Sequence, residues 1–180
     1  IAVIVKSTTS SFFNSVFAGA GVAAAEYNVE LTTEGAVTEE DYEAQNALID
    51  QAVENGADAI VISAVDFHGN EEAVQRAADQ GLPIVVIDSD VNSDDVICRI
   101  GTDNFAAGRM AAETVLSGTE GLLSIGIVNF DENTANGQER ETGFREVVGE
   151  SIRVKEVKTI NVLSTIEDAR QGTRELIQEN

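Results

Sequence analysis

Polar and aromatic side chains follow the short apolar runs of this sequence. Carboxylates and amides that hydrogen-bond to hydroxyl groups, beside aromatic rings that cover C–H faces, suit a small polyhydroxylated ligand. If the apolar runs are strands of an open parallel sheet, these side chains lie where such sheets bind ligands. From composition alone, the plainer interpretation of exposed, solvated loops is the better supported. The segments are residues 6–13, 63–69, 88–92, 103–104 and 129–138, and they include Phe12, Phe13, Phe67 and Phe130.

Catalytic and metal-binding constellations are scarce. His68 is the only histidine and Cys98 the only cysteine, which leaves no zinc ligand set and no intrachain disulfide. A Ser–His–Asp triad would have to use His68, and the chain has no Gly-x-Ser-x-Gly motif. Residues 88–94 imitate the start of an EF-hand loop, but Ser93 stands where glycine is required. We therefore expect no catalytic residue, no metal site and no cofactor, and we expect Cys98 to be a small buried side chain.

The composition is that of a globular but strongly acidic protein. Of the 180 residues, 43% are hydrophobic and 24% charged, and the formal charge is −21. This charge speaks against nucleic acid as a partner, because no basic surface is available to displace counterions from phosphates. It also speaks against docking on an anionic membrane. Of the 32 acidic residues, 18 fall in residues 1–100, where we expect helix glutamates that face water and keep the protein soluble.

Apolar β-branched runs alternate with longer helical stretches, and the unit repeats about every 25–30 residues, the length of a βαβ step. Right-handed crossovers then give an α/β fold of parallel sheets flanked by helices. Thr38 with Asp41 predicts a capping-box start for the second helix. Gly19 and Gly21 fall inside the first helix, where small residues would let it pack closely on the sheet. We predict strands at residues 1–5, 28–33, 58–63, 84–87, 96–100, 122–129 and 152–159, and helices at 12–26, 39–55, 70–80, 105–116, 137–148 and 166–178.

The periodic pattern indicates two lobes. It changes after Asp88 and begins a new cycle near residues 100–104, where we place a domain junction. An N-terminal lobe then spans residues 1–102 and a partial C-terminal lobe residues 103–180. The second lobe holds two predicted strands, too few for a covered sheet. Because the chain opens on a buried strand and stops where another strand is expected, we expect it to be truncated at both ends.

Five motifs follow one another along the chain. They are Ser10-Ser-Phe-Phe13; Asp58-Ala-Ile-Val-Ile-Ser63 with Asp66; Ile84-Val-Val-Ile-Asp88; Gly101-Thr-Asp-Asn104 with Gly108; and Gln138-Glu-Arg-Glu-Thr-Gly-Phe144. In this order and spacing they resemble the type I periplasmic binding proteins, and among them the ribose-binding-protein-like sugar receptors. The resemblance covers nearly the whole chain. It implies a two-lobed α/β fold, here without its C-terminal third, whose lobes close on a sugar like a hinge and deliver it to an ABC transporter.

The resemblance also implies a ligand site in the cleft between the lobes. The phenyl rings of Phe12 and Phe13 would stack on the sugar. Asp88 would accept hydrogen bonds from vicinal hydroxyls, since ionised acceptors form the stronger bonds, and Asn104 would sit at the hinge. The full set of ligand-binding residues carried over is Ser11, Phe12, Phe13, Ser63, Asp66, Asp88, Ser89, Asn104 and Gln138.

Three of these positions depart from the ribose-type pattern. Ser89 and Gln138 stand where ribose-type members carry arginine, and Ser63 where they often carry asparagine. Each change removes a group with several hydrogen-bond donors. Ribose itself is therefore doubtful as the ligand, and a different pentose, a hexose, a polyol or a small signalling sugar remains open.

More than one class of function stays open. The first is an extracytoplasmic solute-binding receptor, in the periplasm or lipid-anchored at the cell surface, which works as a monomer with an ABC transporter permease. The second is the effector domain of a LacI-type transcription regulator, and a third is the sugar-sensing domain of a membrane receptor kinase. Residues 43–62 favour the transport receptor, because regulators more often carry Asp-Gly in place of Asp58-Ala59. An enzyme is the least favoured class.

Overall fold

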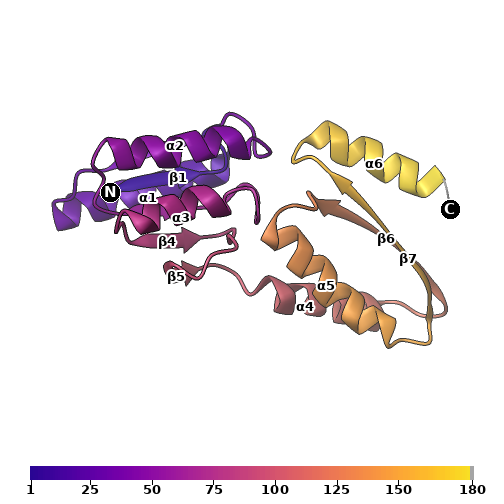
Figure 1. Cartoon of the computed structure of the whole chain (residues 1–180). Helices are drawn as coiled ribbons and strands as arrows, with labels where there is room; N and C mark the ends of the chain where they lie inside the picture. Colours follow the sequence, from indigo (N-terminus) through magenta and orange to yellow (C-terminus); the bar gives the residue numbers. More distant parts are fainter. Residues whose placement is uncertain (179–180) are drawn as a thin grey trace. The chain divides into compact units, whose positions relative to one another are not determined.

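The computed structural model describes residues 1–178, and the chain divides into two compact units, Ile1–Gly101 and Thr102–Asn180 (Figure 1). Each unit alternates strands with helices and pairs its strands in parallel. Parallel pairing requires a crossover connection. A helix supplies it in every case except between Ile87 and Val96, where the loop of residues 88–95 connects two paired strands. The α/β class predicted from the sequence is confirmed.

The first unit is built on a five-stranded parallel sheet. Its strands are β1 (Ala2–Val5), β2 (Thr32–Gly35), β3 (Ile60–Ile62), β4 (Ile84–Ile87) and β5 (Val96–Ile100), in the order β2-β1-β3-β4-β5. Ile4 lies opposite Ile62, which lies opposite Val86. This register brings the carboxyl ends of β1, β3 and β4 to one edge of the sheet. The strand order reverses between β1 and β3, the kind of switch point at which open sheets bind ligands.

Three helices cover the two faces of this sheet: α1 (Ser11–Tyr27), α2 (Tyr42–Glu54) and α3 (Glu71–Asp79). Alternate strand residues point to opposite faces. Ile4 and Ile62 therefore pack in one core with residues of α2 and α3, whereas Val3 and Val5 pack with Phe13 of α1. The apolar side chains on both faces explain why β1 is buried along its whole length.

Two predicted boundaries of the first unit are wrong. The second strand begins at Thr32 rather than Asn28, because Asn28 takes a left-handed conformation (φ 54°) that ends α1. The cap of α2 is Asp41, whose carboxylate accepts a hydrogen bond from the backbone N–H of Ala44 at 2.9 Å, and not Thr38.

Two predicted environments are also wrong. Cys98 is exposed, because β5 is an edge strand and leaves residues 97–100 open to solvent. Gly19 and Gly21 do not serve packing on the sheet. A side-chain carbon placed at either glycine would meet nothing within 4 Å.

The second unit consists of α4 (Asn104–Gly118), β6 (Leu123–Phe130), α5 (Ala135–Gly149), β7 (Val154–Val162) and α6 (Ile166–Gln178). Strands β6 and β7 pair in parallel, with α6 on one face and α4 and α5 on the other (Figure 1). The side-chain contacts agree with this layering. Leu176 of α6 lies against Gly126, while Asn129, on the opposite face of β6, bonds to Glu141 of α5.

Helices α4 and α5 cross at two glycines. A side-chain carbon at Gly108 would overlap the backbone carbonyl of Arg140, and one at Gly143 would overlap that of Phe105. The two backbones approach so closely that only glycine fits at these positions.

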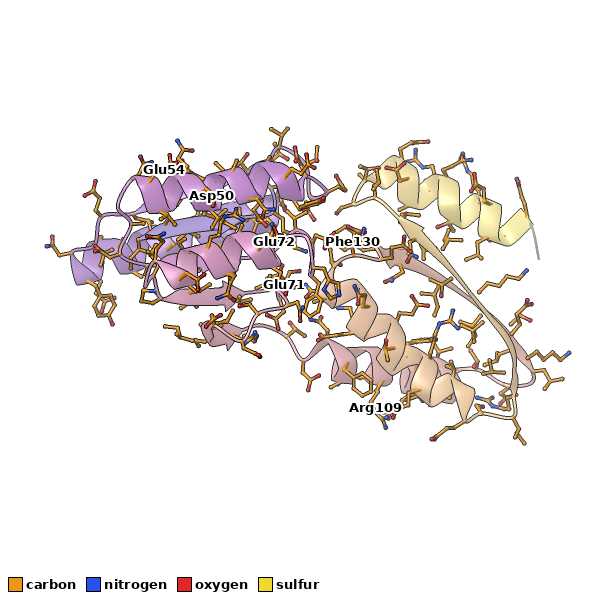
Figure 2. The ribbon with its side chains drawn as sticks, in the orientation of Figure 1. Asp50, Glu54, Glu71, Glu72, Arg109 and Phe130 are labelled. Atoms are coloured by element: carbon orange, nitrogen blue, oxygen red, sulfur yellow. The ribbon has the colours of Figure 1, made fainter. Side chains whose placement is uncertain are left out.

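Acidic side chains cover the outer helices of the first unit. Figure 2 shows Asp50 and Glu54 on α2 and Glu71 and Glu72 on α3, all at least partly exposed. Asp50 pairs with Arg76 at 2.8 Å. None of the helices within residues 1–178 combines the length and the apolar character that crossing a membrane requires.

Candidate functional site

Asp88 lies directly after β4 in an unusual backbone conformation. Its φ is 58°, in the left-handed region that aspartate adopts more readily than most residues. Its backbone N–H donates to the carbonyl of Ile100 at 2.9 Å. A side-chain carbon at Gly101 would lie 3.1 Å from the carbonyl oxygen of Asp88, so the glycine makes room for this turn. The half-buried Asp88 is thus held at the strand end by β5.

Ser63 and Ser89 lie beside Asp88 in the same cluster. The hydroxyl of Ser63 donates to Asp88 Oδ2 at 3.2 Å, and the N–H of Ala64 donates to the carbonyl of Ser89 at 3.1 Å. Both serines are 0% exposed. The Ser89 hydroxyl has no hydrogen-bond partner anywhere in residues 1–178. A buried hydroxyl without a partner costs about 1–3 kcal/mol, so this group calls for an explanation.

Gln45 of α2 holds the end of β3 in place. Its Nε2 donates to the carbonyl of Ser63 at 2.9 Å, and its Oε1 accepts from the N–H of Val65 at 2.9 Å. The residue is fully buried. Gln45 was not among the site residues predicted from the sequence. Its spacing with Leu48, Ile49 and Ala52 places an amide on the apolar face of α2, and this was the signal that its side chain bonds to a partner inside the protein.

Asp66 shapes the loop after β3. Its Oδ1 accepts from the N–H groups of His68 at 2.9 Å and Gly69 at 2.7 Å, and its own N–H donates to Asn70 Oδ1. Asn70 is buried and donates in turn to Asn46 Oδ1 at 2.7 Å. His68 is on the surface, with its side chain 71% exposed.

The aromatic pair at the start of α1 divides between core and solvent. Phe13 is buried against Val3 and Val5, whereas Phe12 is 55% exposed. Their rings meet edge to face with centroids 5.0 Å apart. Ser11, in the first turn of the helix, is exposed.

In the second unit, Asn104 joins the starts of α4 and α5. Its Nδ2 donates to Asn136 Oδ1 at 3.1 Å, and its Oδ1 accepts from Arg140 Nε at 2.7 Å. Asn104 and Asn136 are buried. Gln138 is exposed, and its amide donates to the carbonyl of Glu132. Sequence reasoning did not single out Asn136 or Arg140, because only the packing of the two helices brings them to Asn104.

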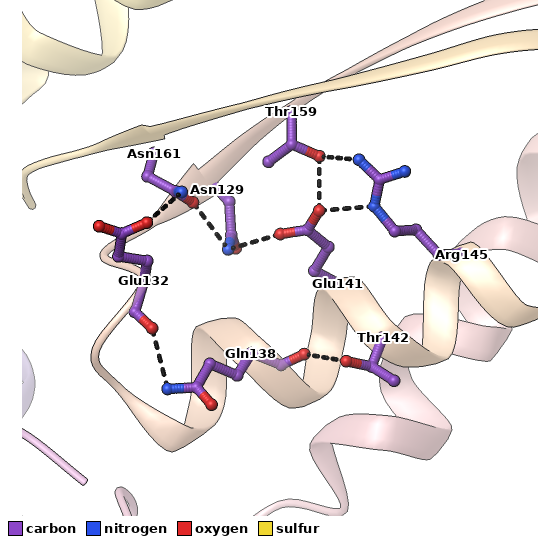
Figure 3. Close-up of polar contacts among 8 residues, drawn as sticks. All are labelled: Asn129, Glu132, Gln138, Glu141, Thr142, Arg145, Thr159 and Asn161. Atoms are coloured by element: carbon purple, nitrogen blue, oxygen red, sulfur yellow. Dashed lines mark hydrogen bonds and ion pairs between the residues drawn. The ribbon is translucent and has the colours of Figure 1, made fainter. Parts of the chain in front are cut away.

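A further polar network lies between α5 and the β6–β7 pair (Figure 3). Glu141 accepts from Thr159 Oγ1 and Arg145 Nε, both at 2.6 Å, and from Asn129 Nδ2 at 3.3 Å. Burial alone would raise the pKa of Glu141. The hydrogen bonds from Thr159 and Arg145, with the charge of Arg145, outweigh burial and lower the pKa below its ordinary value.

The structure therefore brings Ser63, Asp88 and Ser89 together in the first unit and places Asn104 in a separate polar cluster of the second. Within residues 1–178, no three histidine, cysteine, aspartate or glutamate side chains gather in a way that could hold a metal ion. What the arrangement offers is an oriented carboxylate beside a buried hydroxyl. Such groups bind hydroxyl-bearing ligands by hydrogen bonds.

Comparison with known proteins agrees with this chemistry. A family model described as a periplasmic binding protein domain matches residues 1–180. A D-ribose/D-allose-binding protein of Pseudomonas aeruginosa is 27% identical over 156 residues, covering 82% of this chain and 49% of that protein. A D-apiose import binding protein of Actinobacillus succinogenes is 29% identical, covering 87% of this chain and 50% of that protein. The chain thus spans about half the length of these curated relatives.

A solved structure extends the similarity to three dimensions. A carbohydrate transporter solute-binding protein from Agrobacterium radiobacter, in complex with D-arabinose, is 29% identical and superposes with a TM-score of 0.91. The match covers 99% of this chain and 62% of that protein.

Proposed function

This chain belongs to the periplasmic binding protein family, and from that premise we propose that it binds a small sugar or polyol as part of an extracytoplasmic receptor. The receptor delivers the sugar to the permease of an ABC transporter. The names of the relatives, which include import binding proteins, support this proposal. The relatives are sugar-binding transport proteins rather than enzymes.

One observation indicates which residues would bind the sugar. The Asp88 carboxylate stands half-buried at a strand end, in a left-handed conformation, and accepts a hydrogen bond from the buried Ser63 hydroxyl. A sugar hydroxyl would donate to the half-buried Asp88 carboxylate, whereas the Ser89 hydroxyl, at 0% exposure, is closed to a ligand in this conformation. A hydrogen bond to a charged group contributes about 1.5–3 kcal/mol, enough to make Asp88 the dominant contact.

The remaining residues take supporting roles in this proposal. Phe12 offers an exposed ring for the C–H face of the sugar, and Phe13 supports it by edge contact from the core. Asp66 fixes the loop after β3 through its two backbone bonds. Ser11 and Ser63 belong to the same edge of the first lobe.

The second lobe supplies Asn104 and Gln138 in this proposal, and the lobes close on the sugar by a hinge near residues 101–104. Family membership supports this closure. The receptor acts as a monomer outside the cytoplasm, in the periplasm or anchored by lipid. No described residue favours the alternative of a regulator's effector domain.

The test is a binding screen on the intact protein. Isothermal titration calorimetry with D-ribose, D-arabinose, D-fucose, D-fructose and xylitol should find at least one ligand, with D-ribose not the tightest. Failure of a wider panel of pentoses, hexoses and polyols to bind would contradict the proposal. Salt-dependent retention of the intact protein on DNA would instead support the regulator.

A further inference from the structure

Ser63 directs every polar group it has toward its own unit. Its N–H donates to the carbonyl of Ile4 at 3.0 Å, and its carbonyl accepts from Gln45. Its hydroxyl donates to Asp88 Oδ2 at 3.2 Å and lies 3.5 Å from the backbone nitrogen of Ser89. The residue is 0% exposed. Ser63 is therefore placed to act on Asp88 and not on a bound sugar.

Fixing the Asp88 carboxylate before the ligand binds should increase affinity. Its backbone sits in a region that few residues other than glycine adopt. A carboxylate that can rotate must be ordered when the ligand binds, which weakens affinity, whereas one already fixed by a donor is ordered beforehand. The hydroxyl of Ser63 provides that donor, and it comes from the neighbouring strand end of the same rigid sheet.

Gln45 fixes the backbone of Ser63. Strand β3 ends at Ile62. Beyond that point, both ends of the Gln45 amide bond to the backbone, at the carbonyl of Ser63 and the N–H of Val65. Gln45 stands in the same helix as Ile49, which belongs to the main core. A fully buried amide is costly unless its polar atoms form hydrogen bonds. The two hydrogen bonds of Gln45 meet this requirement, and they fix the backbone of residues 63–65.

We propose that Ser63 and Gln45 are positioning residues for the sugar-binding carboxylate: Ser63 orients Asp88, Gln45 holds Ser63, and neither touches the sugar. This proposal rests on the function proposed above. It changes the role that sequence similarity implied for Ser63, from a ligand contact to a support of the ligand contact.

The test compares variants of the intact protein by calorimetry, with the tightest-binding sugar of the panel and its single-deoxy analogues. Ser63→Ala should weaken binding about 3- to 10-fold, the effect of mobilising one side chain. Ser63→Cys, which keeps a weak donor, should fall between Ser63→Ala and the parent. Gln45→Met should weaken binding in the same way. Gln51→Met, the matched change at an exposed glutamine of the same helix, should leave affinity unchanged.

The deoxy analogues separate positioning from direct contact. If Ser63 acts through Asp88, removing the sugar hydroxyl that bonds to Asp88 abolishes the effects of Ser63→Ala and Asp88→Asn together. If Ser63→Ala instead loses its effect with an analogue on which Asp88→Asn still acts, Ser63 touches the sugar and this proposal is wrong. Unchanged affinity in Ser63→Ala would also overturn it. Absence of sugar binding by the parent protein would overturn the proposed function, which is a different result.

Discussion

The same substitution at two helix glycines should have opposite effects on stability. Gly108 lies where α4 crosses α5, and a side-chain carbon there would overlap the backbone of Arg140. Gly108→Ala therefore forces the helices apart, which costs about 1–3 kcal/mol. Gly21 lies inside α1, and a side-chain carbon there would meet nothing within 4 Å. Gly21→Ala removes a flexible residue from a helix interior and should stabilise the protein by about 0.5–1 kcal/mol.

Urea unfolding of the intact protein, followed by circular dichroism, measures both changes as differences in the free energy of unfolding. The two variants should differ by about 1.5–4 kcal/mol, with the parent between them. Because α4 and α5 carry Asn104 and Gln138, Gly108→Ala should also weaken sugar binding, whereas Gly21→Ala should not. A neutral or stabilising Gly108→Ala would refute the close crossing. A destabilising Gly21→Ala would refute the account of that helix face.

Three further predictions concern single side chains. Glu141→Gln should destabilise the protein at pH 7, and because the pKa of Glu141 is lowered in the folded state, the difference should shrink as the pH falls below about 4 in urea titrations. Cys98 should react with a thiol reagent in the native protein as fast as after unfolding, which absorbance measurements would show. Asp50→Asn should cost less than about 1 kcal/mol, and less still at high salt, because its pair with Arg76 is exposed.

The course of the chain followed from its apolar periodicity. β-branched runs such as Ile84–Ile87 are strands, and the helix predicted at residues 166–178 has those bounds in the structure. Asp88 could be placed at a strand end for the same reason. The exposure of Cys98 could not be predicted, because whether β5 is an edge or a central strand depends on the spatial order of all five strands.

The hydrogen-bond partners of the site residues could not be predicted from the sequence. Gln45 bonds to Val65 and Arg140 bonds to Asn104, pairs that are 20 and 36 residues apart in the chain. No local spacing rule connects such residues, and only the packing of α2 on the sheet and of α4 on α5 brings them together. The left-handed conformation of Asp88 likewise depends on Ile100, the last residue of β5, and on Gly101, which follows it.

The proposed function requires that the carboxylate of Asp88 accepts hydrogen bonds from a bound sugar. Calorimetry of Asp88→Asn in the intact protein tests this contact, since asparagine keeps the shape of the side chain and tolerates the left-handed backbone but removes the charge. Affinity for the tightest-binding sugar should fall about 10-fold or more, with the melting temperature nearly unchanged. Asp94→Asn, at an exposed aspartate of the same loop, should bind like the parent. Equal affinity of Asp88→Asn and the parent protein would show that the Asp88 carboxylate does not bind the sugar.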